Sequence, residues 1–354
     1  MNPLEEDLDH ILAHTSGIWE PVRNQGIFVT GGTGFFGRWI LEGFAHANRK
    51  LKLGAHMVVL SRDPEAFNSR APHLTADPAI RFVSGDVRTF TAASVHDQLG
   101  KQSRGRYSFV IHAATQSSAK LNSENPLLMI DTITAGTRSA LEFAVASEAQ
   151  RFLLTSSGAV YGRQPSEVTH LPETFNGAPD LTDPNSAYAE AKRMAELLCA
   201  AYQKEQGLGS VIARGFAFVG PFLPLDTHFA IGNFIRDAVA GGPIEVNGDG
   251  TPYRSYLYAA DLVIWLWTIL LKGRPGRAYN VGSEDAHTIH ELAKIVAGVC
   301  GTEMIHVKER PDPARPAQRY VPSCQRAMEE LGLRQWIDLS EGIRRTATSA
   351  RKGL

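Results

Sequence analysis

Gly26-Ile27-Phe28-Val29-Thr30-Gly31-Gly32-Thr33-Gly34-Phe35-Phe36-Gly37 is the stretch that decides the fold. It begins as a buried strand, continues as a glycine-rich turn, and is followed by an amphipathic helical pattern over residues 38–46. This order is the context of a dinucleotide-binding loop, because glycine lets the backbone turn sharply and approach a pyrophosphate. The start of the helix then offers free N–H groups to the phosphates. The residues predicted to contact the cofactor here are Gly31, Thr33, Gly34, Phe35, Phe36, Gly37 and Arg38.

The end of the second predicted strand, residues 57–60, bears on the choice of cofactor. A site that prefers NAD usually places an acid at this strand end, where it holds the ribose 2′-hydroxyl. Here Ser61 and Arg62 follow the strand, and a hydroxyl and a guanidinium suit a 2′-phosphate better. Arg38 would supply a second cation, whereas Asp63 is a later candidate for the ribose. The sequence therefore favours NADP, with NAD as the alternative.

Further strands are expected at regular intervals, at residues 81–83, 108–111, 152–154 and 210–214. Helical patterns stand between them, notably over residues 125–148. This alternation predicts an α/β fold, a Rossmann-like doubly wound parallel sheet with helices on both faces. Ligands of such sheets bind at the carboxyl ends of the strands, where His112, Ala113, Ala114 and Thr115 are expected. His112 itself is more typical of a packed structural histidine than of an acid or base.

The pattern divides the chain into three parts. Residues 1–25 are predicted to form an N-terminal helical extension that Asn2 caps. Residues 26–216 are predicted to form the dinucleotide-binding domain. Residues 217–354 are expected to form a smaller C-terminal α/β substrate domain, with residues 252–283 returning to the first domain. Within that part, the predicted elements are helices at 231–240, 260–271 and 289–300 and strands at 244–246, 254–258 and 279–282.

Composition limits the classes of function. The formal net charge is -1 over 354 residues, which gives no general attraction to nucleic acid or to an anionic membrane. The N-terminus is acidic, unlike a signal peptide, and the apolar run at 262–271 is shorter than the ~20 residues that span a bilayer. Cys199, Cys300 and Cys324 lack metal-ligand spacing and are typical of free thiols in a reducing compartment. We therefore predict a cytoplasmic protein without a metal site.

Tyr188-Ala189-Glu190-Ala191-Lys192 carries the candidate chemistry. A tyrosine and a lysine four residues apart on a helix lie on the same face. A free phenol has a pKa near ~10 and is a poor base at neutral pH, but a nearby cation favours the phenolate. Lys192 is therefore expected to lower the pKa of Tyr188 and to make it a proton shuttle. On its own, the spacing also fits a tyrosine at a helix edge beside a solvated lysine.

In order and spacing, six motifs resemble the extended short-chain dehydrogenase/reductase superfamily, in its NAD-dependent epimerase/dehydratase (nucleotide-sugar) branch. The resemblance runs from Ile27 to about Arg345. The motifs lie at residues 30–37, 85–87, 112–114, 156–162 and 188–192, and at 248–251 followed by Arg254. It implies a nucleotide-diphosphate sugar as substrate and a homodimer formed by two helices of each subunit.

The resemblance also implies roles for single residues. Tyr188 would be the general acid/base, Ser157 would hold the reacting oxygen, and Lys192 would bind the nicotinamide ribose. Asp86, with Val87 beside it, would contact the adenine part of the cofactor. The substrate would meet Thr115, Ser157, Gly158 and Arg254, whose guanidinium suits a diphosphate.

Departures from the family pattern narrow the reaction. Relatives that dehydrate or decarboxylate the sugar usually carry a carboxylate where this chain has Gly158 and Ala159, so a 4,6-dehydratase or a decarboxylase is disfavoured. Ala217 and Ile133 stand where many relatives have Asn. An epimerase and a 4-ketoreductase, both moving a hydride at a sugar carbon, remain open. A non-catalytic NADP-binding sensor or scaffold is the alternative from another class.

Overall fold

The computed structural model describes residues 4–100, 106–115, 119–227, 229–312, 314 and 316–353. Its centre is a seven-stranded sheet in the order β11-β6-β5-β4-β1-β2-β3, in which every neighbouring pair is parallel. The strands are β1 (Gly26–Thr30), β2 (His56–Ser61), β3 (Ile80–Ser84), β4 (Phe109–His112), β5 (Arg151–Ser157), β6 (Gly209–Gly215) and β11 (Ala278–Val281). The predicted doubly wound α/β fold is confirmed.

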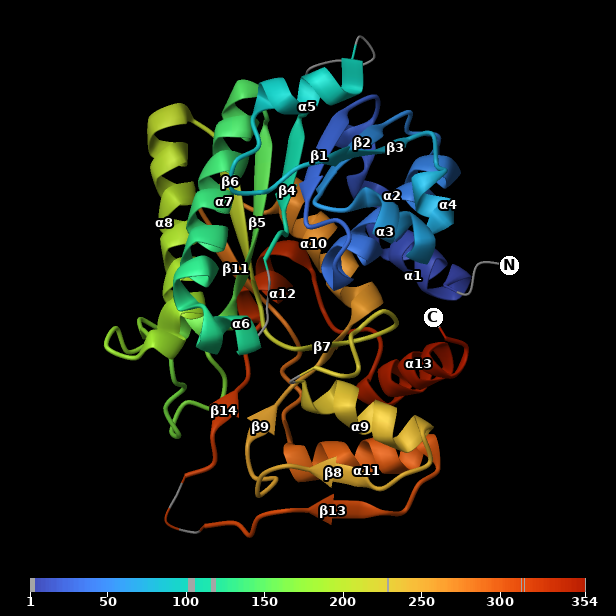
Figure 1. Cartoon of the computed structure of the whole chain (residues 1–354), viewed down its shortest axis with the longest axis vertical. Helices are drawn as coiled ribbons and strands as arrows, with labels where there is room; N and C mark the ends of the chain where they lie inside the picture. Colours follow the sequence, from blue (N-terminus) through green and yellow to red (C-terminus); the bar gives the residue numbers. More distant parts are fainter. Residues whose placement is uncertain are drawn as a thin grey trace.

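Helices cover both faces of this sheet (Figure 1). One face packs against α2 (Phe35–Leu51) and α10 (Ala259–Lys272), and α1 (Glu5–Thr15) packs on these two helices. The other face packs against α7 (Pro126–Ala146) and α8 (Ala187–Gln206). Short helices α3 (Pro64–Arg70), α4 (Pro72–Thr75), α5 (Ala92–Leu99) and α6 (Ala119–Glu124) join the strands of the first half. Along β1, Ile27 and Val29 belong to the first core and Phe28 to the second, as the alternation of a strand requires.

α10 is the most enclosed helix, since every residue from Ala259 to Leu271 is buried. It lies between the sheet and α1, with α2 beside it, so it has no face exposed to solvent. This confirms the predicted buried helix. Among the described residues, no helix combines the length and apolarity that a membrane crossing needs.

A smaller C-terminal region lies beyond the carboxyl ends of the large sheet (Figure 1). Its helices are α9 (Ala230–Val239), α11 (Ile289–Cys300) and α13 (Leu339–Arg351), whereas α12 (Gln325–Leu331) packs against β11 and α10. Its short strands are β7 (Phe218–Val219), β8 (Ile244–Val246), β9 (Tyr253–Arg254), β10 (Leu257–Tyr258), β12 (His287–Thr288), β13 (Ile305–Val307) and β14 (Arg319–Tyr320). They form three sheets, β12-β9-β14, β10-β7 and β13-β8. α10 and β11 rejoin the large sheet, while the domain boundaries themselves remain a prediction.

Two predicted elements differ from the structure. α2 begins at Phe35 and not at residue 38, because Gly34 already takes the N-cap position, and it runs on to Leu51. The single strand predicted over residues 254–258 is two strands, β9 and β10, in different sheets. Ser255 and Tyr256 between them are both buried, so the chain here passes through the core and has no solvent face.

The N-terminal helix α1 is part of the core. Leu4, Leu8 and Ile11 are buried, and the Tyr258 hydroxyl donates to Asp7 Oδ2 at 2.8 Å. Asp7 also pairs with Arg345 of α13, which ties the two ends of the chain together. The predicted Asn2 cap lies outside the described residues.

Candidate active site

The glycine-rich loop is shaped by contacts that leave no room for side chains. Gly31 has φ +75°, and a Cβ there would lie 2.4 Å from backbone atoms of Ala113 and Ala114. A Cβ on Gly37 would lie 2.2 Å from the Gly31 carbonyl oxygen. The loop after β1 is thus folded on itself and against the loop after β4. This is the backbone cradle that a pyrophosphate needs at the start of α2.

Three residues proposed for the ribose end of the cofactor already have roles in the fold. Ser61 is buried, and its Oγ accepts the Asp63 backbone N–H at 3.2 Å. Asp63 caps α3 by accepting from the Ala66 N–H at 2.9 Å. The Arg38 guanidinium lies 3.3 Å from the centre of the Phe222 ring, and burial lowers its pKa. Arg62 remains exposed at the strand end.

Asp86 follows β3 and is held by Arg88, which the sequence analysis missed. Arg88 Nη2 donates to Asp86 Oδ2 at 2.6 Å and its Nε donates to Oδ1 at 3.0 Å. These hydrogen bonds lower the pKa of Asp86 to about 2. Val87 packs beside Gly136 of α7, where a Cβ would lie 3.1 Å from it. The spacing Asp-x-Arg was visible in the sequence and could have suggested the pair.

His112 is locked inside the sheet. Its Nδ1 lies 2.7 Å from Thr30 Oγ1, and its Nε2 lies 3.2 Å from Thr137 Oγ1. Burial lowers the pKa of the imidazole to about 3, so the ring is neutral near pH 7. The side chain is a packed histidine between β1 and α7. Because both ring nitrogens have partners within the fold, only the backbone of His112 is available to contact a cofactor.

Lys192 lies at the carboxyl ends of β4 and β5. Its Nζ donates to Thr115 Oγ1 and to the Thr155 carbonyl oxygen, both at 2.7 Å. Burial lowers the pKa of Lys192 to about 8. Thr115, predicted to contact the substrate, is therefore a partner of Lys192 in this structure. Thr155 was missed because a backbone carbonyl gives no signal in the sequence.

Tyr188 lies one helical turn before Lys192. Burial raises the pKa of its phenol, and a hydrogen bond from Ser157 offsets this in part. The predicted lowering of this pKa by Lys192 is wrong for this structure. Lys192 Nζ is turned toward Thr115 and Thr155 and lies 6.0 Å from the centre of the Tyr188 ring.

Aromatic rings close the side of the site next to Ser157. A Cβ on Gly158 would lie 2.7 Å from the ring of Phe216, so the ring occupies the space of a side chain at that position. Phe216 packs on Tyr320, with ring centres 4.7 Å apart. The Tyr320 hydroxyl lies 3.5 Å from Ser157 Oγ. Sequence reasoning gave neither aromatic residue a role, because Tyr320 belongs to no motif and comes from the far end of the chain.

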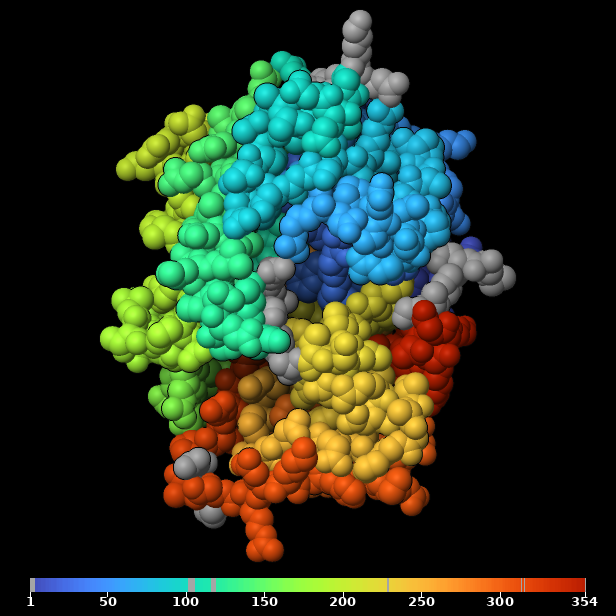
Figure 2. Space-filling model, viewed as in Figure 1, coloured from blue at the N-terminus to red at the C-terminus, as the bar shows by residue number. Residues whose placement is uncertain are grey.

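Arg254 stands on β9, in the three-stranded sheet of the C-terminal region. Its Nη1 donates to the Tyr253 carbonyl oxygen at 2.8 Å, and its guanidinium carbon lies 5.9 Å from the centre of the Tyr320 ring. Tyr320 thus lies between Arg254 and Ser157, whereas the predicted roles of Arg254 and Ser157 toward a substrate stay predictions. The recess between the first half of the chain, in blue and cyan, and the yellow α9 region is visible in Figure 2.

A partly buried ion pair braces the strand ends beneath the site. Arg214 Nη2 and Glu196 Oε2 are 2.6 Å apart, and Ser156 Oγ donates to Glu196 Oε1 at 2.6 Å. Arg214 Nη1 also donates to the Tyr161 hydroxyl at 2.9 Å. The pair connects β5, β6 and α8, so it holds the backbone that presents Ser157.

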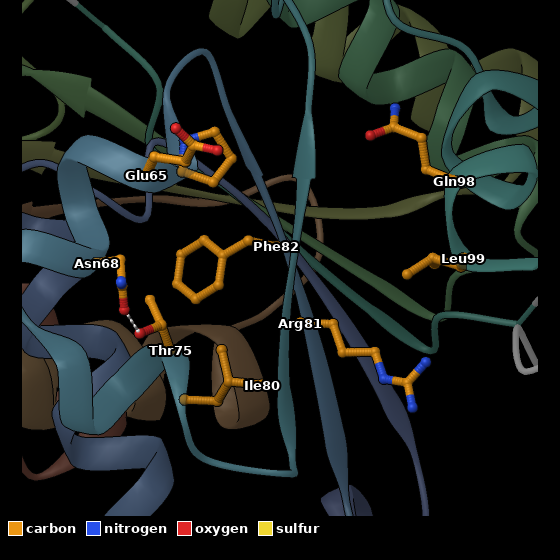
Figure 3. A pocket seen from close by; sticks show the side chains of 9 residues that line it. Glu65, Asn68, Thr75, Ile80, Arg81, Phe82, Gln98 and Leu99 are labelled. Carbon is orange, nitrogen blue, oxygen red and sulfur yellow. Dashed lines mark hydrogen bonds between the residues drawn. The ribbon is translucent and has the colours of Figure 1, made fainter.

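An open hollow lies elsewhere, along the outer edge of β3 (Figure 3). Its lining residues are Pro64, Glu65, Asn68, Thr75, Ile80, Arg81, Phe82, Gln98 and Leu99. Asn68 and Thr75 are hydrogen-bonded at one side of it. None of the residues that the sequence singled out lines this hollow. Within the described residues, no cluster of His, Cys, Asp and Glu has the arrangement of a metal site.

Comparisons with known proteins agree with this geometry. Residues 27–282 match the model of the NAD dependent epimerase/dehydratase family. UDP-glucuronic acid decarboxylase 1 of Danio rerio is 28% identical over 353 residues, covering 98% of this chain and 79% of the relative. UDP-glucuronic acid decarboxylase 1 of Arabidopsis thaliana is 30% identical over 92% of this chain and 69% of its own length.

Solved structures with the same fold include two nucleotide-sugar enzymes. UDP-glucose 4-epimerase of Thermotoga maritima, solved with UDP-glucose, superposes with a TM-score of 0.77 at 22% identity and covers 93% of this chain and 99% of its own. dTDP-glucose 4,6-dehydratase of Streptomyces venezuelae, solved with NAD and TYD bound, gives a TM-score of 0.76 at 25% identity, over 93% and 97%. Three different reactions are thus represented among proteins similar to this chain.

Proposed function

Because the chain belongs to the NAD-dependent epimerase/dehydratase family, of the extended short-chain dehydrogenase/reductase type, we propose that it is a nucleotide-sugar epimerase or 4-ketoreductase. In either reaction a hydride moves at a sugar carbon while Tyr188 moves a proton at the attached oxygen. A nucleotide sugar is common to the names of the similar epimerase, dehydratase and decarboxylases. The closed position at Gly158 is the observation that supports the narrower choice.

That position lacks both an acid and the space for one. An elimination needs a group that takes or gives a second proton beside the tyrosine. Phe216 fills the volume that a side chain at residue 158 would need, and Ala159 carries no polar group. The hydroxyls of Ser157, Tyr188 and Tyr320 remain as polar groups of the site, and none of them is a carboxylate. The site therefore favours hydride transfer without elimination.

The residues present fit a dinucleotide. Gly31 and Gly37 carry no Cβ, and a Cβ at either position would collide with neighbouring backbone atoms. The backbone N–H groups at the start of α2 are therefore left for a pyrophosphate. Asp86 would hold the adenine end, and Lys192 the nicotinamide ribose. Bound there, the nicotinamide would accept or return the hydride.

The chain's own residues account for the proton. Tyr188 would donate to, or accept from, the sugar oxygen as the hydride moves at the neighbouring carbon. Ser157 would hold that oxygen by a second hydrogen bond. Lys192, kept in place by Thr115 and Thr155, would favour the ionised phenol once the ligands bring its Nζ closer. Arg254 would bind the diphosphate, for which a guanidinium is suited.

Decarboxylation of a nucleotide-linked uronic acid is the second candidate, because the curated relatives carry that name. One experiment separates the possibilities: freshly purified protein is denatured and the released nucleotide is identified, and native protein is then incubated with UDP-glucuronic acid, UDP-glucose and dTDP-glucose. Retained cofactor with interconversion of two epimers supports an epimerase. An empty protein that oxidises a reduced cofactor with a 4-keto-sugar supports a reductase. Release of CO₂ would replace the proposal by decarboxylation, and no reaction at all would support a non-catalytic sensor.

We further propose that the ribose end admits NADP as well as NAD. Arg62 is exposed after β2, and its charge contributes to the lowered pKa of Asp86, so it lies near the adenine end. In Arg62→Ala we expect the Kd of NADP to rise about tenfold with little change for NAD, since one charged hydrogen bond is lost. Arg274→Ala, at the opposite edge of the sheet, is the control. Equal effects of Arg62→Ala on both cofactors would contradict the 2′-phosphate argument.

A homodimer is proposed through α7 and α8. Apolar side chains are exposed on both helices, at Leu127 (77%), Ile130 (36%), Met194 (47%) and Leu197 (62%). The two helices pack side by side on one face of the sheet (Figure 1), so two copies could join them into a four-helix contact. Sedimentation at micromolar concentration should give a dimer that Leu127→Lys with Leu197→Lys dissociates. A wild-type monomer would contradict the proposal.

The cytoplasmic location remains a prediction.

A further inference from the structure

The small sheet that carries Arg254 also carries a second tyrosine toward Ser157. β9 is the central strand of this sheet, and Arg254 is paired with His287 on β12 and with Tyr320 on β14. Residues paired across neighbouring strands project from the same face. Arg254 and Tyr320 therefore share one face, and the guanidinium carbon lies 5.9 Å from the centre of the tyrosine ring.

The Tyr320 hydroxyl ends beside the acid/base pair. It lies 3.5 Å from Ser157 Oγ and 3.5 Å from the Gly215 carbonyl oxygen. Stacking on Phe216 fixes the direction of the ring. The Ser157 hydroxyl also acts on Tyr188, because it lowers the pKa of that phenol and so offsets part of the effect of burial. Ser157 Oγ accepts the Ala159 backbone N–H at 3.1 Å as well. Ser157 of β5 is thus the group through which Tyr320 of β14 can act on Tyr188 of α8.

We propose that Tyr320 is a positioning residue of the active site and acts through the hydroxyl of Ser157. Ser157 has a single proton to donate. When it donates that proton to Tyr188, its oxygen is left to accept from Tyr320, whose hydroxyl otherwise donates to the Gly215 carbonyl oxygen at the same distance of 3.5 Å. The chain Tyr320 to Ser157 to Tyr188 then points one way. Hydrogen bonds in such a chain polarise one another. The C-terminal region would therefore set the orientation of a group that belongs to the large sheet.

The charges around the pair fit this direction. Burial raises the pKa of Tyr320, so its phenol stays protonated and can donate. Lys192 of α8 lies 6.0 Å from the centre of the Tyr188 ring, Arg254 of β9 lies 5.9 Å from that of Tyr320, and Tyr161 adds a further phenol. An ionised Tyr188 is stabilised by the hydrogen bond from Ser157, which Tyr320 supports. Removing the Tyr320 hydroxyl should therefore make Tyr188 harder to ionise.

A titration of the protein without substrate tests this step. The pH titration of phenolate absorbance is recorded for wild type and for Tyr188→Phe, and the difference gives the titration of Tyr188 in the wild-type protein. The same difference between Tyr320→Phe and the double variant Tyr320→Phe with Tyr188→Phe gives the titration of Tyr188 without the Tyr320 hydroxyl. We expect Tyr320→Phe to raise the pKa of Tyr188 by about one unit, because a hydrogen bond that favours the charged form is weakened. Tyr253→Phe, whose ring stacks on Arg319 from the neighbouring register position, is the matched control and should shift nothing. An unchanged titration in Tyr320→Phe would overturn the proposal.

Ser157→Ala provides a variant that is independent of how Tyr320→Phe folds. It removes the middle hydroxyl, so it must raise the pKa of Tyr188 at least as much as Tyr320→Phe. A smaller shift would show that no relay exists. Both titrations are made without substrate, so their results do not depend on whether the proposed function is right. The kinetic test below does rest on that function.

Kinetics with an accepted nucleotide sugar test the same link during reaction. Tyr320→Phe should lower kcat about tenfold, the equivalent of one lost hydrogen bond in the transition state, with little change in KM. In a Ser157→Ala background the further change Tyr320→Phe should have no effect, because the two residues act through one contact. A rise in KM alone, or a full additional loss in the double variant, would make Tyr320 a direct substrate contact and contradict the positioning role.

Discussion

The two regions that meet at the site are built in different ways. The large sheet presents Ser157 and Tyr188 from a seven-residue strand and a 20-residue helix. The C-terminal region presents Arg254 and Tyr320 from strands of two residues each. The first pair is held by continuous secondary structure, and the second by the register of strands that are distant in the sequence.

The difference in strand length suggests that the large sheet holds the residues that move the proton and that the C-terminal region holds those that bind the substrate. A proton-moving group needs a fixed position, and the ends of long buried strands provide it, here braced by the Glu196–Arg214 pair. Short strands and the loops between them can vary without disturbing the core. We therefore expect substitutions in the large sheet to affect turnover or folding, and those in the C-terminal region to affect binding, except at Tyr320, which acts on turnover through Ser157 of the large sheet. The following predictions test that division.

The largest effect is expected at Tyr188. Tyr188→Phe removes the hydroxyl and keeps the ring, so turnover on any accepted nucleotide sugar should fall roughly 10³-fold, within the range of general acid–base catalysis. Hydride transfer in a single turnover measures it directly. Tyr202→Phe, on the same helix with its hydroxyl 3.5 Å from Glu142, is the control and should keep full activity. Full turnover in Tyr188→Phe would show that Tyr188 is not the general acid/base and would contradict the assignment of the proton transfer to the large sheet.

The elements of the large sheet could be predicted because their signals are local. The glycine loop, the Tyr188 helix and the buried α10 each show their type within a short window of sequence. Bounds were less certain, since the start of α2 depends on Gly34 as the cap. The pKa of Tyr188 could not be predicted, because it depends on its burial and on where Lys192 Nζ points. That direction is set by Thr115 in the loop after β4 and by Thr155 on β5.

The next effect in size concerns the space around the glycine loop. In Gly37→Ala the new Cβ would lie 2.2 Å from the Gly31 carbonyl oxygen, so the backbone must move, at a cost of about 1–3 kcal/mol in the free energy of unfolding. Gly298→Ala is a matched helical control, exposed and with nothing within 4 Å of its Cβ. That change should stabilise the protein by about 0.5–1 kcal/mol. Urea unfolding measures both, and equal stability of Gly37→Ala and wild type would contradict the packed cradle.

A smaller effect is expected in the C-terminal region. Arg254→Ala should raise KM for the nucleotide sugar about tenfold, the loss of a charged hydrogen bond to the diphosphate, and leave kcat little changed. Arg319→Ala, one residue before Tyr320 and stacked on Tyr253 with 3.9 Å to the ring centre, is the control. Initial rates over a range of substrate concentrations separate the two constants. A fall in kcat at constant KM would break the division between the regions.

The partners within the C-terminal region could not be predicted from sequence. Tyr320 lies far along the chain from Ser157 and from Phe216, and no periodic pattern connects them. The strand predicted at residues 254–258 had the right alternation, yet the chain crosses the core at Ser255 and divides between two sheets. Pairing of strands of two residues is decided by the surrounding packing, which local propensity does not contain.

The smallest effect compares one carboxyl from each region. Arginines hold the pKa of Asp86 and the pKa of Glu341 at about 2, through Arg88 in the first case and Arg344 with Arg345 in the second. Each carboxyl is ionised more readily in the folded chain, so its contribution to stability is present above the unfolded pKa and is lost as the pH falls through about 2. In Arg88→Ala the pKa of Asp86 should rise toward its usual value of 3.8, so the folded and unfolded pKa become similar and the contribution of Asp86 to stability disappears at every pH. Carbon-detected NMR titration of the two carboxyls measures this, with Glu341 unchanged because its own arginines remain. If the pKa of Asp86 stayed near 2 in Arg88→Ala, the charge of Arg62 and the backbone N–H of residue 88 would be the groups that lower it. That result would contradict the role given to the Arg88 guanidinium.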